Sequence, residues 1–300
     1  MADNLGRPIV VPEHKMAEFK ALTQAPKYAK PTMLLTLVCL VSAATIITFA
    51  LMGLIEYALA AVLLGMTYYW SFSTVHDSIH RSVSTNLKLN DAIGGTVVRC
   101  IVPYANVGLM RWAHMEHHRF TNDPRDPDHW SHGAWYTLPF RWMLIDLAYA
   151  VRLFGDKSKM AQSVKKQFLP SFIIGLSLIV GLIALGYGEE YFWLSFVPSR
   201  IMFLGMGFTF FWLPHNHWHG EEELRQDTNF SKATSVRLGK EWILNPLLQY
   251  QNYHLIHHMW PTTPFYNNQK VWQLLEPELR QRDLVLSEGF KLYPEEVPHA

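Results

Sequence analysis

The stretch MLLTLVCLVSAATIITFALMGL, residues 33–54, contains no charged residue over 22 positions. As an α-helix rising 1.5 Å per residue it would be about 33 Å long, close to the thickness of the hydrocarbon core of a bilayer. After Glu56, the stretch YALAAVLLGMTYYWSFSTV, residues 57–75, is again uncharged. Residues 33–75 therefore predict a tight transmembrane hairpin.

A second pair of apolar stretches lies further along the chain, at residues 169–188 and 191–214. Only Glu189 and Glu190 separate them, and Arg200 is the one charged residue within them. A buried core helix is the alternative for any one stretch, but four stretches of this length in two hairpins indicate membrane spans. We therefore predict an all-α integral membrane fold with four transmembrane helices and a cytoplasmic helical cap.

The chain shows no internal repeat, low-complexity tract or Gly/Ser-rich linker, so one membrane domain is predicted over residues 33–266. The N-terminal segment 1–32 and the C-terminal segment 267–300 are expected to be cytoplasmic. The first 30 residues are polar and contain several prolines and lysines, so no secretory signal is predicted.

Lysine and arginine residues gather on one side of the predicted membrane. Of the 26, five precede Met33, twelve lie between the hairpins, eight follow Pro214 and one is Arg200. Because basic residues accumulate in cytoplasmic loops, both termini and the central loop are predicted to face the cytoplasm. The net charge of +1, without a basic run carrying interleaved aromatics, predicts no nucleic-acid partner.

Eleven of the 15 histidines fall in four short clusters, HDSIH, HMEHH, HNHWHG and HLIHH. The clustered residues are His76 and His80; His114, His117 and His118; His215, His217 and His219; and His254, His257 and His258. Residues three and four apart share one helix face, so each cluster can point several nitrogens at one place. All four clusters also fall on the predicted cytoplasmic side.

These histidines predict a site for two metal ions. One zinc ion takes four ligands in a structural site, or three and a water in a catalytic site, and eight or nine imidazoles exceed that number. The two cysteines, Cys39 and Cys100, match no metal or redox spacing. An all-histidine site beside a lipid phase favours oxygen activation by non-haem iron. The alternative for a single cluster is a solvated helix face.

Polar residues beside the clusters are candidates to orient the histidines, because a metal-bound imidazole usually donates its other ring N–H to a carboxylate or carbonyl. The stretch TNDPRDPDHW predicts a proline-set loop that offers Asp126 and Asp128 to the HMEHH helix, with a solvated turn as the alternative. Asp77 and Asn252 are expected to act in the same way beside the first and last clusters. The histidines outside the clusters, to which we assign at most a supporting role, are His14, His129, His132 and His299.

The motifs HDSIH, HMEHH and NYHLIHH resemble the three histidine boxes of the integral-membrane di-iron superfamily of fatty acid desaturases, alkyl hydroxylases and carotenoid oxygenases. The resemblance covers residues 33–266. Within this superfamily, NDPRDPDHW, FWLPH and QNYHLIHHMWPTTPFY look most like the bacterial and cyanobacterial carotenoid (β-carotene) ring hydroxylases. Relatives that act on fatty acids share these short motifs more loosely.

The resemblance implies iron ligands at His76, His80, His114, His117, His118, His254, His257 and His258. It also implies one further ligand near the end of the fourth span. His215 occupies that place, but acyl desaturases carry Asn four residues before this ligand, and Phe211 stands there in this chain. If His219 is the ligand, His215 falls at the Asn position, so both remain candidates. His217 faces another side of a helix.

The implied activity is O2-dependent oxidation of an unactivated C–H bond of a long lipid, with two iron ions as cofactor and O2 as co-substrate. No nucleotide fingerprint, haem motif or fused electron-transfer domain is visible in the sequence. Electrons are therefore expected from a separate cytoplasmic donor such as ferredoxin. The implied location is the bacterial inner membrane.

The leading hypothesis for the substrate is a carotenoid ring, which would be hydroxylated, because the aromatic, proline-stiffened stretches FFWLPH and WPTTPFY suit a bulky isoprenoid ring. The alternative is a fatty acid or acyl lipid, with desaturation or oxidative decarboxylation to a terminal alkene. The non-enzyme alternative is a metal transporter or sensor. Transporters place polar ligands at mid-membrane depth, whereas the apolar stretches here contain no histidine.

Overall fold

The computed structural model describes residues 9–298, so His299 lies outside the described residues. The α-helices are α1 Met16–Thr23, α2 Lys30–Leu51, α3 Tyr57–Ile79, α4 Leu87–Ile101, α5 Val107–Phe120, α6 Leu138–Met143, α7 Ile145–Gly155, α8 Lys159–Ala184, α9 Gly188–Tyr191, α10 Val197–Met206, α11 Glu241–Leu247, α12 His254–Met259 and α13 Asn268–Leu279. The 3-10 helices are η1 Glu13–Lys15, η2 Pro127–Ser131, η3 Trp135–Thr137, η6 Glu222–Leu224, η7 Phe230–Lys232 and η8 Phe265–Asn267. The π-helical segments are η4 Phe192–Phe196 and η5 Gly207–Trp212, and the strands are β1 Ser235–Leu238, β2 Leu284–Glu288 and β3 Glu295–Val297.

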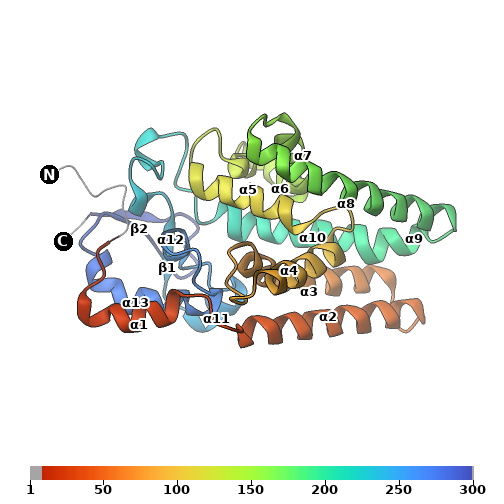
Figure 1. The fold of residues 1–300 in the computed structure, drawn as a ribbon, viewed down its shortest axis with the longest axis horizontal. Helices are drawn as coiled ribbons and strands as arrows, with labels where there is room; N and C mark the ends of the chain where they lie inside the picture. Colours follow the sequence, from red (N-terminus) through yellow and green to blue (C-terminus); the bar gives the residue numbers. More distant parts are fainter. Residues whose placement is uncertain (1–8, 299–300) are drawn as a thin grey trace.

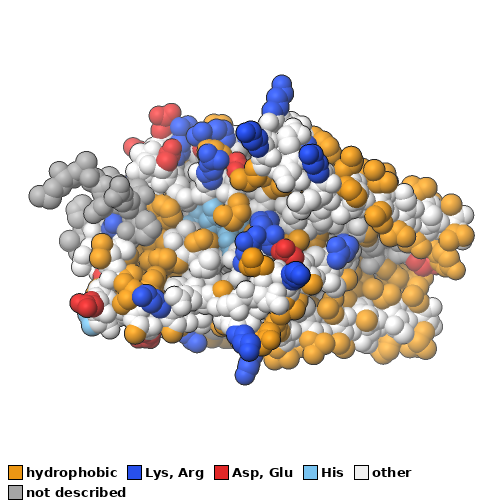
Figure 2. Space-filling model, in the orientation of Figure 1, with side chains coloured by type: hydrophobic (Ala, Val, Ile, Leu, Met, Phe, Trp, Pro, Cys, Tyr) orange, Lys and Arg blue, Asp and Glu red, His pale blue; other side chains and the backbone are white. Residues whose placement is uncertain are grey.

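Four helical segments are long and apolar enough to cross a membrane, which confirms the predicted fold class. They are α2, α3, α8 and the continuous run Gly188–Trp212, which comprises α9, η4, α10 and η5. Figure 1 shows these segments extending together toward one end of the molecule. Hydrophobic side chains cover that end in Figure 2, as expected for a surface in contact with lipid.

Two of the spans are longer than the apolar stretches in the sequence. α3 continues to Ile79, beyond residue 75, and α8 begins at Lys159, before residue 169. Hydropathy identifies only the part of a helix that is apolar enough for lipid. The helix itself extends to the residues that cap its ends. At the start of α8 this cap is Ser158, whose hydroxyl accepts a hydrogen bond from the Ala161 N–H at 3.1 Å.

The second and fourth spans form the inner pair of the bundle. In the most apolar window of each span, 56% of α3 and 61% of the fourth span are buried, against 22% of α2 and 17% of α8. Glycine permits a close approach within the inner pair, because a Cβ on Gly65 of α3 would lie 2.6 Å from Ile201 Cγ2 of α10. α3 and the fourth span therefore lie inside the bundle, whereas α2 and α8 leave most of their apolar surface on its outside.

Arg200, the charged residue of the fourth span, is half-buried and paired. Its Nη2 and Nη1 atoms donate to the carboxylate of Asp146 on α7, at 2.7 and 2.9 Å, and Tyr104 Oη donates to the same carboxylate at 2.6 Å. A charge at membrane depth is tolerated when it faces the protein interior and has a partner. This pair holds α7 against α10.

The cap contains short helices and a small three-stranded sheet, which the all-α prediction did not include. β1 pairs in parallel with β2, with Ser235 opposite Val285, and β2 pairs antiparallel with β3. A separate apolar core lies beneath this sheet and includes Val236 of β1, Leu284 of β2 and Trp272 of α13. The strands hold three to five residues each, which is too short for a clear period-two pattern.

Candidate metal centre

Nine histidines from four parts of the chain converge in the interior of the cap. α3 carries His76 and is followed directly by His80, α5 carries His114, His117 and His118, α12 carries His254, His257 and His258, and His215 follows η5. All nine are buried. The histidines of α5 and of α12 are three and four residues apart in the sequence. This spacing places them on the inward face of each helix.

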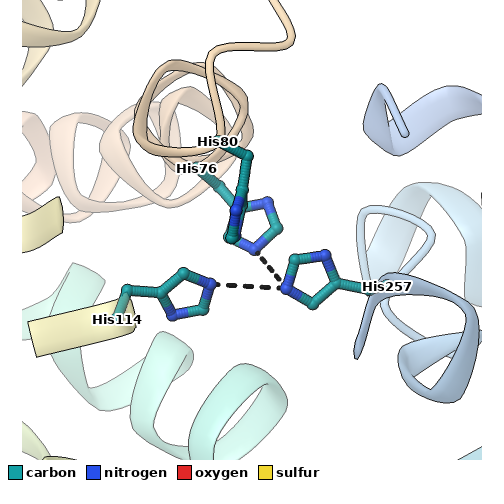
Figure 3. A group of neighbouring side chains, drawn as sticks. All are labelled: His76, His80, His114 and His257. Carbon is teal, nitrogen blue, oxygen red and sulfur yellow. Dashed lines mark hydrogen bonds between the residues drawn. The ribbon is translucent and has the colours of Figure 1, made fainter. Parts of the chain in front are cut away.

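The first group consists of His76, His80, His114 and His257, whose candidate ligand nitrogens all lie within 4.8 Å of one another. Figure 3 shows the four rings reaching toward one point from three helices. The Nε2 atom of His257 lies 3.1 Å from Nε2 of His76 and 3.3 Å from Nε2 of His114.

The second group consists of His117, His215, His254 and His258, again with nitrogens within 4.8 Å of one another. His258 Nε2 lies 3.2 Å from His117 Nε2 and 3.1 Å from His254 Nε2.

His118 lies beside both groups. Its Nε2 atom is 2.8 Å from Nε2 of His257, in the first group. Its ring centroid is 4.3 Å from that of His258, in the second group. The described part of the chain therefore brings together two groups of four imidazoles and a ninth between them.

The geometry of these nitrogens fits bound transition metals. Nitrogens about 2.1 Å from one ion in tetrahedral or octahedral geometry are about 3.0–3.4 Å apart, which is close to the separations within both groups. Two further nitrogens, Nε2 of His80 and Nε2 of His215, are buried with no hydrogen-bond partner among the described residues. Buried polar atoms are normally paired, so these two nitrogens also indicate metal ligands.

Burial keeps most of these imidazoles in the neutral form that metals bind. Burial, reinforced by the neighbouring histidines, holds the pKa well below the usual value for His80, His114, His118, His215, His254, His257 and His258. A neutral imidazole offers one nitrogen as a ligand and keeps an N–H on the other.

His117 differs because two carboxylates face its other nitrogen. Its Nδ1–H donates to Asp126 Oδ2 at 2.9 Å, and Asp128 Oδ2 lies 3.5 Å from the same nitrogen. Burial lowers the pKa of His117, but these carboxylates outweigh burial and raise it to about 9. Tyr149 Oη in turn donates to Asp128. Asp126 and Asp128 thus fix a proton on Nδ1 of His117. Its Nε2 atom is left facing the other histidines of the second group.

Three partners of the histidines were not predicted from the sequence. Nδ1–H of His254 donates to Gln251 Oε1 at 2.8 Å, Nδ1–H of His258 donates to Gln226 Oε1 at 2.9 Å, and Nδ1–H of His215 donates to the Ala233 carbonyl at 3.2 Å. Gln251 stands three residues before His254, so a local spacing rule could have found it. Gln226 lies in a loop far from α12 in sequence and has no local signal.

Other predicted site residues lie away from the two groups. The carboxylate of Asp77 accepts hydrogen bonds from Thr32 Oγ1 at 2.7 Å and Phe265 N–H at 3.1 Å, so it joins α2 to the segment after α12. Asn252 donates to Asn245 Oδ1 at 3.0 Å and has no bond to a histidine. Neither residue orients a histidine, because both face neighbouring segments of backbone and side chain instead.

The histidines of the HNHWHG stretch separate clearly. His215 is 1% exposed and belongs to the second group. His217 Nε2–H donates to the Lys232 carbonyl at 2.8 Å, and His219 is exposed. The rings of His129 and His132 contact Trp218, at centroid distances of 5.4 and 5.6 Å, and contact neither group.

A small apolar cavity of about 40 Å³ lies between α3, α4, α5, α7, α8 and α10. Phe72 and Val75 of its lining precede His76 on α3, and Met110 lies one turn before His114 on α5. Phe72 is 6.0 Å from His76 between ring centroids. Tyr104 and Asp146 line the same cavity.

Comparison with known proteins agrees with this arrangement. The sequence matches the fatty acid desaturase family over residues 30–290. It is 27% identical over 197 residues to a beta-carotene ketolase of Paracoccus sp. strain N81106, covering 65% of this chain and 70% of that protein. It is 35% identical over 83 residues to a Delta 8-(E)-sphingolipid desaturase of Kluyveromyces lactis, covering 27% of this chain and 14% of that protein. Since the family match spans all four membrane helices and every histidine of both groups, the chain is a membrane oxidoreductase that belongs to the fatty acid desaturase family.

Proposed function

We propose that this protein is an O2-dependent di-iron oxygenase that oxidises an unactivated C–H bond of a membrane lipid, with a carotenoid ring as its leading substrate. The observation that carries the proposal is the gathering of nine buried imidazoles into two groups, next in sequence to apolar residues that line a cavity between the membrane helices. Imidazole ligands without thiolate suit non-haem iron, and apolar side chains near the first group suit contact with a hydrocarbon.

Each histidine group would hold one iron ion. His76, His80, His114 and His257 would bind the first, His117, His215, His254 and His258 the second, and His118 lies within reach of both. Bound iron would supply the reductive activation of dioxygen, which protein side chains do not perform by themselves.

The protein's own groups prepare the site for this chemistry. Burial favours the neutral form of the ligand imidazoles other than His117, and Asp126, Gln226 and Gln251 each accept an Nδ1–H, which orients the opposite nitrogen inward. Phe72, Val75 and Met110 present a dry, apolar surface on which a lipid would rest beside the first group. The chain thereby orients the C–H bond and excludes water.

Hydroxylation inserts one oxygen atom of O2 into the C–H bond and reduces the other to water, which consumes two electrons and two protons. A separate donor such as ferredoxin would deliver these electrons from the cytoplasm. The distribution of basic residues supports this orientation, because the turns at residues 52–56 and 185–187 contain no Lys or Arg. We place the protein in the bacterial inner membrane with both termini cytoplasmic.

The carotenoid assignment is supported by the similarity to a beta-carotene ketolase, which extends over 65% of this chain. A second candidate, desaturation of an acyl or sphingoid chain, is favoured by the higher identity to a sphingolipid desaturase, although over only 27% of this chain. The two reactions start from the same abstraction of hydrogen. They differ in whether a hydroxyl is added or a second hydrogen is removed.

Expression in a bacterial host that accumulates β-carotene, followed by chromatography of carotenoids and acyl lipids, tests the substrate. Hydroxylated or ketolated rings are expected. Unchanged carotenoids with new double bonds or terminal alkenes in the acyl pool would transfer the assignment to the second candidate. No oxidised lipid of either kind, despite an iron-loaded protein and a supplied reductant, would reject the proposed function.

Replacing Asp126 tests the role of the carboxylates in the second group. In Asp126→Asn the side chain can still accept the Asp128 N–H, to which Asp126 Oδ1 is bonded at 2.8 Å. The negative charge of the Asp126 carboxylate beside His117 Nδ1 is lost. Groups that support metal ligands typically change affinity by about 10–100-fold, so we expect one of the two irons to be lost that much more readily to a chelator.

Asp123→Asn is the matched control, since Asp123 lies in the same loop and binds Arg125 at 2.8 Å rather than a histidine. Iron content measured across a chelator titration reports the result. Equal retention of both irons in the two variants would show that Asp126 does not support His117.

A further inference from the structure

A surface hollow of about 670 Å³ lies between α5, α7 and the start of α8, and we call it the α5 hollow. Its walls include three arginines and three apolar side chains, namely Arg119, Arg125, Arg152, Trp112, Val151 and Met160. The arginines, Val151 and Met160 are all exposed, so a molecule outside the protein can contact them directly. None of these residues belongs to either histidine group.

Cations outnumber carboxylates at the α5 hollow. Lys157 and Lys159 are exposed on either side of Ser158, which is part of its wall, so five exposed cations lie at or beside it. The carboxylates of the wall are those of Glu116 and Asp156, and both residues are half-buried. The whole chain has a net charge of only +1, so positive charge is concentrated here. Figure 2 shows Lys and Arg side chains gathering over α5 and α7.

Two of the arginines are held beside one aromatic ring. The guanidinium carbons of Arg119 and Arg125 lie 4.8 and 4.3 Å from the centroid of the Phe120 ring. Arg125 pairs with Asp123 at 2.8 Å, whereas the ion pair of Arg119 with Glu116 is long, at 3.9 Å. Like charges held close together repel, and an anionic partner offsets that repulsion. The charge of the α5 hollow is therefore complementary to an acidic surface.

Apolar side chains lie among these cations. Val151 is 74% exposed and Met160 is 51% exposed, and Trp112 forms part of the same wall. Exposed apolar groups surrounded by charge mark interaction sites, and protein interfaces are enriched in tryptophan, methionine and arginine. This composition suits a protein partner.

The position of the α5 hollow along α8 distinguishes a protein partner from lipid headgroups. Met160 in its wall precedes the apolar stretch of α8, which begins at residue 169, by nine residues. At a rise of about 1.5 Å per residue this separation is about 14 Å, whereas the headgroup layer is about 5–8 Å thick. Figure 1 shows α8 running from α7 toward the membrane end of the molecule. The hollow thus lies beyond the headgroups, on the side that we propose to be cytoplasmic.

The α5 hollow and the histidine groups lie on opposite sides of one helix. Trp112, Glu116 and Arg119 are four and three residues apart, so they share one face of α5. His117 and His118, which stand between Glu116 and Arg119 in the sequence, are buried on the other face. A helix with its side chains is about 10–12 Å across, so the hollow is about one helix diameter from these histidines.

We propose that the α5 hollow is the docking surface for a small acidic iron–sulfur protein that supplies electrons to the metal centre. This inference rests on the proposed function, because it names the surface at which the required donor binds. In each encounter the donor is oxidised by one electron, which crosses α5 and reduces the iron pair. Two encounters supply the two electrons that hydroxylation consumes. Acidic side chains of the donor pair with the arginines, and its apolar surface covers Val151 and Met160.

The test is the binding of a plant-type ferredoxin, a small acidic protein, to the iron-loaded protein in phosphatidylcholine nanodiscs. The variant combines Arg119→Gln with Lys159→Glu. Both positions are exposed, and an acidic residue is favourable in the first turn of α8. We expect Kd for ferredoxin to rise about tenfold, and the reduction of iron by reduced ferredoxin to slow by a similar factor. The difference should shrink at high salt, because the range of an exposed charge falls from about 10 Å at ~0.1 M salt to about 3 Å at ~1 M.

Two controls accompany the variant. Lys20→Glu changes an exposed cation on α1, which lies on the opposite edge of the molecule from α5 in Figure 1, and should leave ferredoxin binding unchanged. Reduced methyl viologen is a small cation that needs no docking surface, so it should reduce the iron at the same rate in all the proteins.

Unchanged ferredoxin binding in the double variant, or an equal loss in Lys20→Glu, would overturn the proposal, since the arginines would then serve no acidic protein partner. The result is separable from the proposed function. Oxidised lipid from the wild-type protein together with unchanged ferredoxin binding in the double variant rejects this inference alone. Weakened ferredoxin binding in the double variant, with no oxidised lipid from the wild-type protein, rejects the proposed function alone.

Discussion

His257→Ala is expected to abolish turnover and to remove iron from the first group. His257 Nε2 is the common neighbour of the group, at 3.1 Å from His76 Nε2, 3.3 Å from His114 Nε2 and 2.8 Å from His118 Nε2. Even residues that only support metal ligands change affinity or activity by about 10–100-fold. Loss of a ligand at the centre of the group should therefore lower turnover by more than about 100-fold.

Iron content and oxidised lipid are measured on the same purified protein, and His257→Gln provides a variant of similar volume in case the truncated side chain affects folding. His14→Ala is the control, since His14 is exposed and contacts neither group. Full iron content with wild-type turnover in His257→Ala would reject the assignment of the first group.

Substitution of the two candidate ligands near the end of the fourth span should give opposite results. His215→Ala removes a buried imidazole whose ring lies 5.0 Å from those of His117 and His254, between centroids. It should release iron from the second group and lower turnover by more than about 100-fold, because loss of a ligand should exceed the effect of about 10–100-fold seen for residues that only support ligands. His219→Ala removes an exposed side chain, and we expect it to keep both irons and near-normal turnover.

The pair is internally controlled, because both residues lie in one loop and receive the same substitution. Iron content per protein and product formed in the β-carotene host are the two measurements. A larger loss of iron in His219→Ala than in His215→Ala would reverse the assignment and place the loop differently around the second group.

The sequence by itself determined the membrane fold and the histidines of the candidate site. Absence of charge over the length of a bilayer is a property of one contiguous stretch, so the four spans could be predicted without any knowledge of their neighbours. The spacing of His114, His117 and His118 acts within a single helix in the same way. Asp126 lies only nine residues from His117, so a local loop was enough to predict their proximity.

The tertiary structure alone decided how these local pieces combine. His76 and His257 are 181 residues apart, and they meet only because α3 and α12 pack around one interior point. The position of His215, rather than His219, in the second group depends on how the chain leaves η5, and Gln226 reaches His258 from a loop with no motif of its own. Arg200 was visible as a lone charge in a span, but its partner Asp146 lies 54 residues away. Periodicity describes one helix at a time, whereas such contacts depend on the simultaneous packing of several elements, which no local pattern encodes.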